Sequence, residues 1–67
     1  MNKAAIEDRM REKRISVRGL CREIGIDTST WYRKMQKNGE TFNAYELSGI
    51  KRVLELSNDQ AVDMLLS

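Results

Sequence analysis

Hydrophobic side chains recur along the chain at the three- and four-residue spacing of a helix face, and this pattern predicts five short helices. The predicted helices span residues 3–13, 17–24, 28–37, 44–56 and 58–66. The clearest apolar stripe belongs to the second helix and consists of Val17, Leu20, Cys21 and Ile24. No window alternates with a period of two, so we expect no strand. The predicted fold class is all-α, a compact bundle of about five short helices.

Capping residues predict where the second and third helices begin and end. Ser16 is a suitable N-cap for the second helix, and Gly25 follows that helix at a position that favours a positive φ. Asp27 is expected to cap the third helix, with its carboxylate accepting a hydrogen bond from the amide of Ser29 or Thr30. The second and third helices are therefore joined by a very short connection that contains a glycine.

Two capping boxes predict the starts of the last two helices. Asn43 with Glu46, and Ser57 with Gln60, have the spacing at which a cap and the third helical residue bind each other's backbone. Gly19 lies inside the second helix, where glycine costs about 0.5–1 kcal/mol relative to alanine. Either it allows another backbone to approach closely or it is simply tolerated, and the sequence leaves both interpretations open.

Composition narrows the class of protein. A chain of 67 residues forms one domain at most, residues 1–67. One cysteine and no histidine exclude an internal disulfide and a Cys/His zinc site, so neither a metal nor a cofactor is expected. The chain also lacks a glycine-rich phosphate loop, and we expect no enzyme and no small-molecule substrate. No apolar run approaches the roughly 18–20 residues of a membrane span and no signal peptide is recognised, so a cytoplasmic location without membrane association is expected.

Charge is distributed unevenly along the chain. Residues 9–37 hold nine basic and three acidic side chains, a net charge of +6. Residues 38–67 hold two basic and five acidic side chains, a net charge of −3. This division indicates a polyanion-binding face in the first half of the chain, although ordinary solvated helix charge is an alternative interpretation.

The second and third helices have the residues that a steep helix crossing requires. Cys21 is small where the two helices would touch, and Gly25 turns the chain between them. Apolar side chains are available from both helices and from their connection to fill the contact: Leu20, Ile24, Ile26 and Trp31. These positions predict a helix-turn-helix over residues 16–37.

The segment SVRGLCREIGIDTSTWYRKM resembles the helix-turn-helix of the lambdoid-repressor and Cro-like superfamily. The following segment NAYELSGIKRVLELS and the capped last helix resemble the small repressor-like regulators of phages and prophages. Two departures stand out. Cys21 occupies a position where the superfamily usually has alanine. Met10 and Met35 occupy the places of a buried Arg–Glu pair, so we expect an apolar contact there.

The resemblance implies that the start of the third helix enters the major groove of DNA. The base contacts that it implies are Thr28, Ser29, Tyr32 and Arg33. The phosphate contacts that it implies are Ser16, Val17 through its amide, Arg18, Lys34, Lys37 and Asn38. Competing interpretations are a surface ion pair between Arg33 and an acid of the first helix, a half-buried Tyr32, and solvated helix-end roles for Arg18 and Lys37.

The first functional hypothesis is a sequence-specific transcription regulator that binds double-stranded DNA as a homodimer on a two-fold operator, in the cytoplasm of a bacterial host and on its nucleoid when bound. The alternative is a helical protein-interaction module, such as an antirepressor or adaptor, that keeps the fold without binding DNA. It would dock through the acidic second half or through the last helix, whose Leu65 and Leu66 either cover the core or form an exposed dimer seam.

Overall fold

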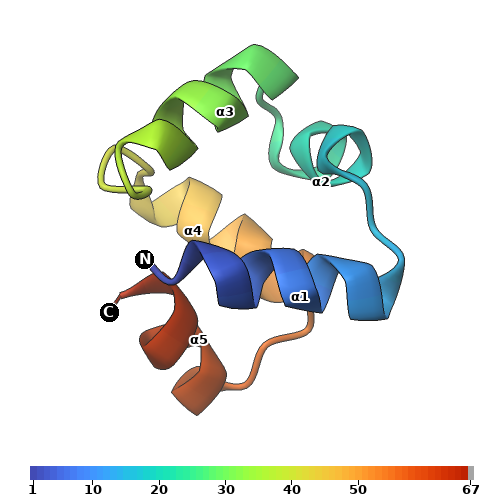
Figure 1. The fold of residues 1–67 in the computed structure, drawn as a ribbon, viewed down its shortest axis with the longest axis vertical. Helices are drawn as coiled ribbons and strands as arrows, with labels where there is room; N and C mark the ends of the chain where they lie inside the picture. Colours follow the sequence, from blue (N-terminus) through green and yellow to red (C-terminus); the bar gives the residue numbers. More distant parts are fainter. Residues whose placement is uncertain (67) are drawn as a thin grey trace.

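Five α-helices joined by short turns make up the computed structural model, which describes residues 1–66 (Figure 1). The helices are α1 (Lys3–Lys13), α2 (Val17–Ile24), α3 (Thr28–Gln36), α4 (Ala44–Val53) and α5 (Asn58–Leu65). No strand occurs within residues 1–66, so the predicted all-α class is confirmed. The Cα radius of gyration is 10.5 Å, close to the roughly 11 Å of a compact domain of this length.

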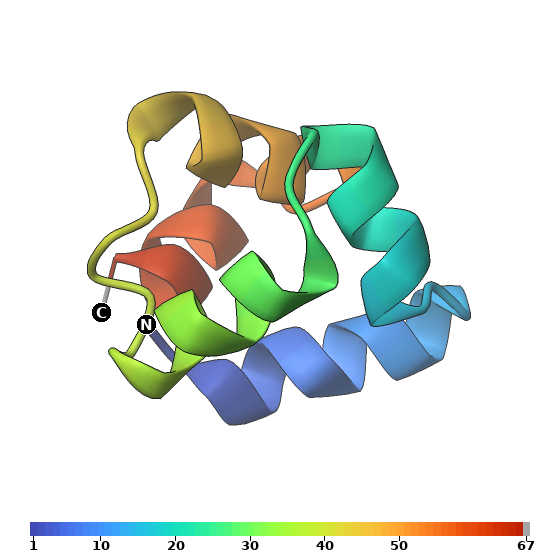
Figure 2. The same ribbon diagram turned by 90° about the horizontal axis from the view of Figure 1, so that it is seen from above.

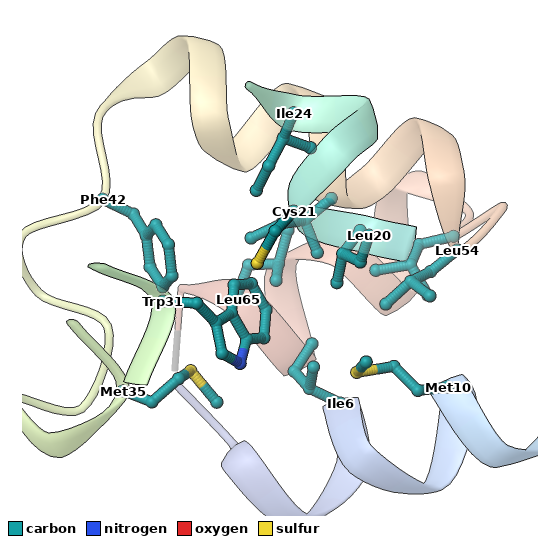
Figure 3. Packing of buried hydrophobic residues seen from close by; sticks show 12 residues of the cluster. Ile6, Met10, Leu20, Cys21, Ile24, Trp31, Met35, Phe42, Leu54 and Leu65 are labelled. Carbon is teal, nitrogen blue, oxygen red and sulfur yellow. The ribbon is translucent and has the colours of Figure 1, made fainter. Parts of the chain in front are cut away.

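The helices wrap around one apolar centre. In Figure 2, α2 rises from the C-terminal end of α1, and α3 runs back toward the N-terminus of α1. The two ends of the chain are adjacent, because the amide of Asn2 donates to the carbonyl of Met64 over 2.8 Å. The buried core draws on every helix: Ile6, Met10, Leu20, Cys21, Ile24, Trp31, Met35, Phe42, Ile50, Leu54, Leu56 and Leu65 (Figure 3). Met10 and Met35 are both buried in this core.

The helix boundaries follow the capping residues. The bounds of α1 and α2 match the prediction, and the side chain of Ser16 accepts from the amide of Gly19 over 3.0 Å. Both predicted capping boxes are present at the starts of α4 and α5, with the side-chain and backbone bonds formed in both directions. Local hydrogen bonding thus decides where these helices begin.

α4 ends three residues earlier than predicted, at Val53 rather than at residue 56. Glu55 has a φ of 53°, and the amide of Leu56 donates back to the carbonyl of Lys51 over 3.0 Å. Arg9 then satisfies the carbonyls that the helix leaves free, since Nε donates to the Leu54 carbonyl over 2.9 Å and Nη2 to the Glu55 carbonyl over 3.1 Å. This contact from α1 allows the chain to turn and bury Leu56.

The close approach considered for Gly19 occurs at Gly49 instead. A Cβ atom on Gly49 would lie 2.6 Å from Cγ2 and 3.3 Å from Cβ of Ile24, so α2 and α4 pack closely here. A Cβ on Gly19 would meet only the Ser16 hydroxyl, at 3.3 Å. Gly19 is therefore tolerated rather than required, whereas Gly49 sets the separation of two helices.

Across residues 1–66, none of the helices combines the length and the apolar character that crossing a membrane would demand.

Candidate nucleic-acid interface

Three residues join α2 to α3. Gly25 ends α2 with a φ of 78°, and its amide donates to the carbonyl of Cys21 over 2.8 Å. The next amide, that of Ile26, donates to the same carbonyl over 3.1 Å, and Ile26 itself is partly buried against the core. Asp27 then occupies the N-cap position of α3 in extended geometry. The positive φ of Gly25 is what allows so short a connection between the two helices.

The predicted capping bond of Asp27 is wrong. Its carboxylate accepts no hydrogen bond from the first turn of α3, although its backbone carbonyl accepts from the amide of Trp31 over 3.0 Å. The side chain is exposed, and water can replace the capping bond at little cost. The carboxylate remains a negative charge near Cys21. Burial, followed by this charge, raises the pKa of the Cys21 thiol.

One side of α3 is anchored in the core. Trp31 and Met35 lie one helical turn apart and are both buried, and the Trp31 ring is 5.3 Å from the ring of Phe42 at an angle of 54° (Figure 3). The small side chain of Cys21 is buried beside these rings in the same view. Because residues three or four positions apart share one face of a helix, anchoring Trp31 and Met35 in the core turns the opposite side of α3 outward.

The outward side of α3 carries all four residues expected to contact bases. Thr28, Ser29, Tyr32 and Arg33 are exposed, and none of their side chains forms a hydrogen bond or ion pair with the rest of residues 1–66. Tyr32 is 57% exposed, so part of its side chain is covered and part faces solvent. Arg33 is not paired with an acid of α1 among the described residues.

Sequence reasoning overlooked Gln36. It is exposed and lies one helical turn beyond Tyr32, so it extends the outward side of α3 to three turns. Its side chain has no partner among residues 1–66. Because Gln36 is four residues after Tyr32, the sequence spacing alone places Gln36 on the same side of α3.

The structure divides the basic residues of segment 9–37 into two groups. Four of the nine form ion pairs: Arg9 with Glu12, Arg11 with Asp8, Lys13 with Glu55, and Lys34 with Glu46. The other five have no ion pair within residues 1–66: Arg14, Arg18, Arg22, Arg33 and Lys37. We call these five residues the unpaired bases. Arg14 caps the C-terminal end of α1, and the other four lie on α2, on α3 or directly after α3, so this is where a polyanion would find uncompensated charge.

The ammonium group of Lys34 is bound within the protein. Its Nζ atom donates to Oε1 of Glu46 over 2.7 Å and to the carbonyl of Thr41 over 3.2 Å, and it lies 5.4 Å from the ring centre of Phe42. The side chain is only 18% exposed. Its charge is therefore already compensated within the protein, and little of it is open to a DNA phosphate.

The remaining residues expected to contact phosphates lie near the two ends of α1. Ser16 and the amides of Val17 and Arg18 begin α2, and these two amides donate to no acceptor within residues 1–66. Lys37 and Asn38 follow α3 and are exposed. In Figure 2 the start of α2 lies beside the C-terminal end of α1, and the end of α3 lies beside its N-terminal end.

Comparison with models of known families, with curated proteins and with solved structures finds no match to this chain. The site offers hydroxyl, phenol, guanidinium and amide groups on one outward helix face, with free helix amides and unpaired bases around it. Groups of this kind bind base edges and phosphates.

Proposed function

We propose that this chain is a sequence-specific, double-stranded DNA-binding transcription regulator of the lambdoid-repressor and Cro-like kind. In this proposal α2, the Gly25–Asp27 connection and α3 form a helix-turn-helix, and α3 enters the major groove. The observation that carries the proposal is the two-sided character of α3. Its inner side is fixed by Trp31 and Met35, and its outer side presents polar groups without partners among the described residues. A groove about 12 Å wide accepts one helix in this orientation.

The proposed base contacts follow from the chemistry of the exposed side chains. Arg33 offers two parallel donors, which match the O6 and N7 acceptors of guanine. Thr28 and Ser29 lie at the start of α3, where a helix approaches the base edges most closely, and their hydroxyl groups can donate or accept. Tyr32 lies between these positions and contacts a thymine methyl group or a sugar.

The proposed phosphate contacts orient the helix without reading sequence. The free amides of Val17 and Arg18 lie at the positive end of the α2 dipole, next to the hydroxyl of Ser16. Arg18 adds its guanidinium group, and Lys37 and Asn38 provide a second anchor beyond α3. Contacts at both ends of the outward face fix the angle of α3 in the groove.

A single domain of this size buries limited area on DNA, so the proposal includes two copies on a two-fold operator. The regulator would act in a bacterial cytoplasm by occupying that operator and thereby blocking or recruiting polymerase. Phage or prophage origin remains part of the proposal on the resemblance of residues 16–35 and 43–57.

The direct test is selection of a binding site from random duplex DNA, followed by affinity measurements at one salt concentration. Arg33→Ala should weaken binding to the selected site by about 1–3 kcal/mol, or roughly 5- to 150-fold. Arg33→Lys keeps the charge but loses the two-donor geometry, so it should recover little of the specificity. Lys13→Gln is the matched control, since it removes one positive charge that the structure pairs with Glu55.

Two results would contradict the proposal at different levels. An Arg33→Ala variant that binds the selected site as tightly as the parent chain removes Arg33 from the base contacts. A chain that retains no duplex DNA at low salt makes the regulator assignment wrong.

The second result would favour a helical protein-interaction module. The observation behind this candidate is the exposure of Val62 and Leu66 on α5, at 55% and 68%. Binding through such a surface should change little with salt, whereas DNA binding should weaken steeply.

A further inference from the structure

Two adjoining hollows lie beside α1. The first, of about 410 Å³, is lined from α3 by Tyr32 and Gln36. The second, of about 460 Å³, is lined by Ser16 at the start of α2. Glu7 and Val17 line both hollows, so the two form one trough, which we call the α1 trough. It connects one of the proposed base contacts, Tyr32, with the proposed phosphate contacts Ser16 and Val17.

Glu7 is the only acidic residue among those that line the α1 trough. Its side chain is exposed and forms no hydrogen bond or ion pair within residues 1–66. Lys3 lies one turn earlier on α1 and lines the first hollow, but it does not pair with Glu7. The neighbouring acids Asp8 and Glu12, in contrast, both pair with arginines of α1. Glu7 therefore places an uncompensated negative charge between two groups of proposed DNA contacts.

We propose that Glu7 repels the DNA backbone and so lowers the affinity of this chain for any duplex DNA. The inference rests on the proposed function, because it concerns the same interface. In Figure 2, α1 extends from the start of α2 to the end of α3, which are the two places proposed to contact phosphates. DNA held at both places brings its phosphates alongside the α1 trough, where the Glu7 carboxylate meets charges of its own sign. Two like charges about 7 Å apart in water repel each other with an energy comparable to the thermal energy.

The repulsion should not depend on DNA sequence, because every nucleotide carries the same phosphate group. Glu7 thus acts on a different part of the binding energy from Arg33, which is proposed to read a base. Attachment to random DNA consists essentially of phosphate contacts. A carboxylate in the α1 trough weakens this attachment, so contacts with bases must make up the difference before the chain stays bound. Glu7 is therefore a determinant of binding strength and not of the sequence that is read.

Glu7→Gln tests the inference, because it removes the charge while keeping the size of the side chain and nearly the same helix propensity. We expect this variant to bind both the selected site and random duplex DNA about 2- to 5-fold more tightly than the parent chain at low salt. The gain should shrink as salt rises, because the screening length falls from about 30 Å at 0.01 M to about 10 Å at 0.1 M. Fluorescence anisotropy titrations at several salt concentrations measure both effects.

Two further variants separate the position of the charge from the net charge of the chain. Glu7→Lys changes the charge by two units, so its fold-gain should be about the square of the gain of Glu7→Gln. Asp63→Asn removes the same charge from an exposed position on α5 that has no ion pair within residues 1–66. Figure 1 places α5 and α3 at opposite ends of the molecule, so Asp63→Asn should leave DNA affinity nearly unchanged. Circular dichroism confirms that each variant keeps its helices.

Four results would overturn the inference: a Glu7→Gln variant that binds no more tightly than the parent chain at low salt, a gain that does not shrink as salt rises, a gain confined to one of the two DNAs, or an equal gain for Asp63→Asn. In each case the parent chain still binds DNA, so the proposed function stands. A parent chain that retains no duplex DNA at low salt contradicts the proposed function instead, and the inference with it.

Discussion

The ammonium group of Lys34 lies 2.7 Å from Oε1 of Glu46, and this ion pair ties the last turn of α3 to the first turn of α4. The same carboxylate oxygen accepts from the amide of Asn43 over 2.9 Å and so completes the capping box of α4. One buried side chain therefore begins a helix and also holds the neighbouring helix that presents the candidate interface. The orientation of the outward side of α3 depends on this contact.

Replacing Glu46 should destabilise the fold strongly. Glu46→Ala removes the Glu46 half of the capping box and leaves the largely buried Lys34 ammonium without its carboxylate, so we expect a loss of about 2–4 kcal/mol in the free energy of unfolding. Urea unfolding followed by circular dichroism measures this loss. Asn58→Ala, which alters an exposed side chain at the start of α5, is the control and should change stability far less.

A double-mutant cycle separates the ion pair from the cap. Lys34→Met leaves the bond between Asn43 and Glu46 in place and should cost less than Glu46→Ala. Lys34→Met combined with Glu46→Gln should cost less than the sum of the two single substitutions Lys34→Met and Glu46→Gln, because no charge then remains buried without its partner. Strictly additive effects of the two substitutions would show that the pair contributes no coupling energy.

Stability should fall in acid partly because of Glu46. Burial raises the pKa of this carboxyl group, but the hydrogen bonds from Lys34 and from the Asn43 amide, with the charge of Lys34, outweigh burial and hold the pKa below its ordinary value of 4.5. Because the unfolded chain then takes up the proton first, this contribution is present above about pH 4.5 and is lost as the pH falls through the folded-state pKa.

Glu46→Gln should therefore flatten the decline in unfolding free energy below pH 4.5. Glu55→Gln is the comparison, since the hydrogen bond and charge of Lys13 also lower the pKa of Glu55. Glu55 is exposed, so its effect on the pH profile should be smaller. Identical profiles for the parent chain and Glu46→Gln would contradict the assignment.

Replacing Gly19 of α2 and Gly49 of α4 with alanine should change stability in opposite directions. Gly49→Ala places a methyl group 2.6 Å from Cγ2 of Ile24 and should cost about 1–3 kcal/mol by forcing α2 and α4 apart. Gly19→Ala meets only the Ser16 hydroxyl at 3.3 Å and gains helix propensity, so it should stabilise by up to about 1 kcal/mol. Thermal unfolding of the pair tests this, and equal effects would show that the close approach at Gly49 is unimportant.

The proposed phosphate contacts should be visible in the salt dependence of DNA affinity. Arg18→Ala and Lys37→Ala should each reduce the slope of log affinity against log salt concentration by about 1, with similar losses on different DNA sequences. Lys13→Gln should leave the slope unchanged, because Glu55 already pairs with that ammonium. A slope that neither Arg18→Ala nor Lys37→Ala alters would remove both residues from the interface.

Local interactions made much of this fold predictable from sequence. The helix faces and the capping boxes at Asn43 and Ser57 depend on residues three or four positions apart, and the structure contains them as expected. The turn at Gly25 is also a local feature that the sequence predicts, because a positive φ depends on the residue at that one position. The burial of Trp31 and Met35, which their spacing of four residues predicts, determines which side of α3 faces outward.

What sequence alone did not decide depends on partners far along the chain. Arg9 reaches the Leu54 carbonyl across 45 residues and ends α4 early, and Lys34 reaches Glu46 across 12 residues. The exposed side chain of Asp27 makes no capping bond to α3, although its residue type and position favour one.

The division of the basic residues has the same origin. The sequence by itself determined that residues 9–37 carry a net +6 and that five helices bury one apolar stripe each. Arg9 and Arg11 pair with acids three residues away on α1, whereas only the tertiary structure decided that Lys13 and Lys34 are neutralised and that Arg33 and Lys37 remain unpaired. The physical reason is that periodicity assigns a side chain to a helix face, whereas an ion pair between distant segments requires those segments to meet, and the packing of the helices sets which of them do.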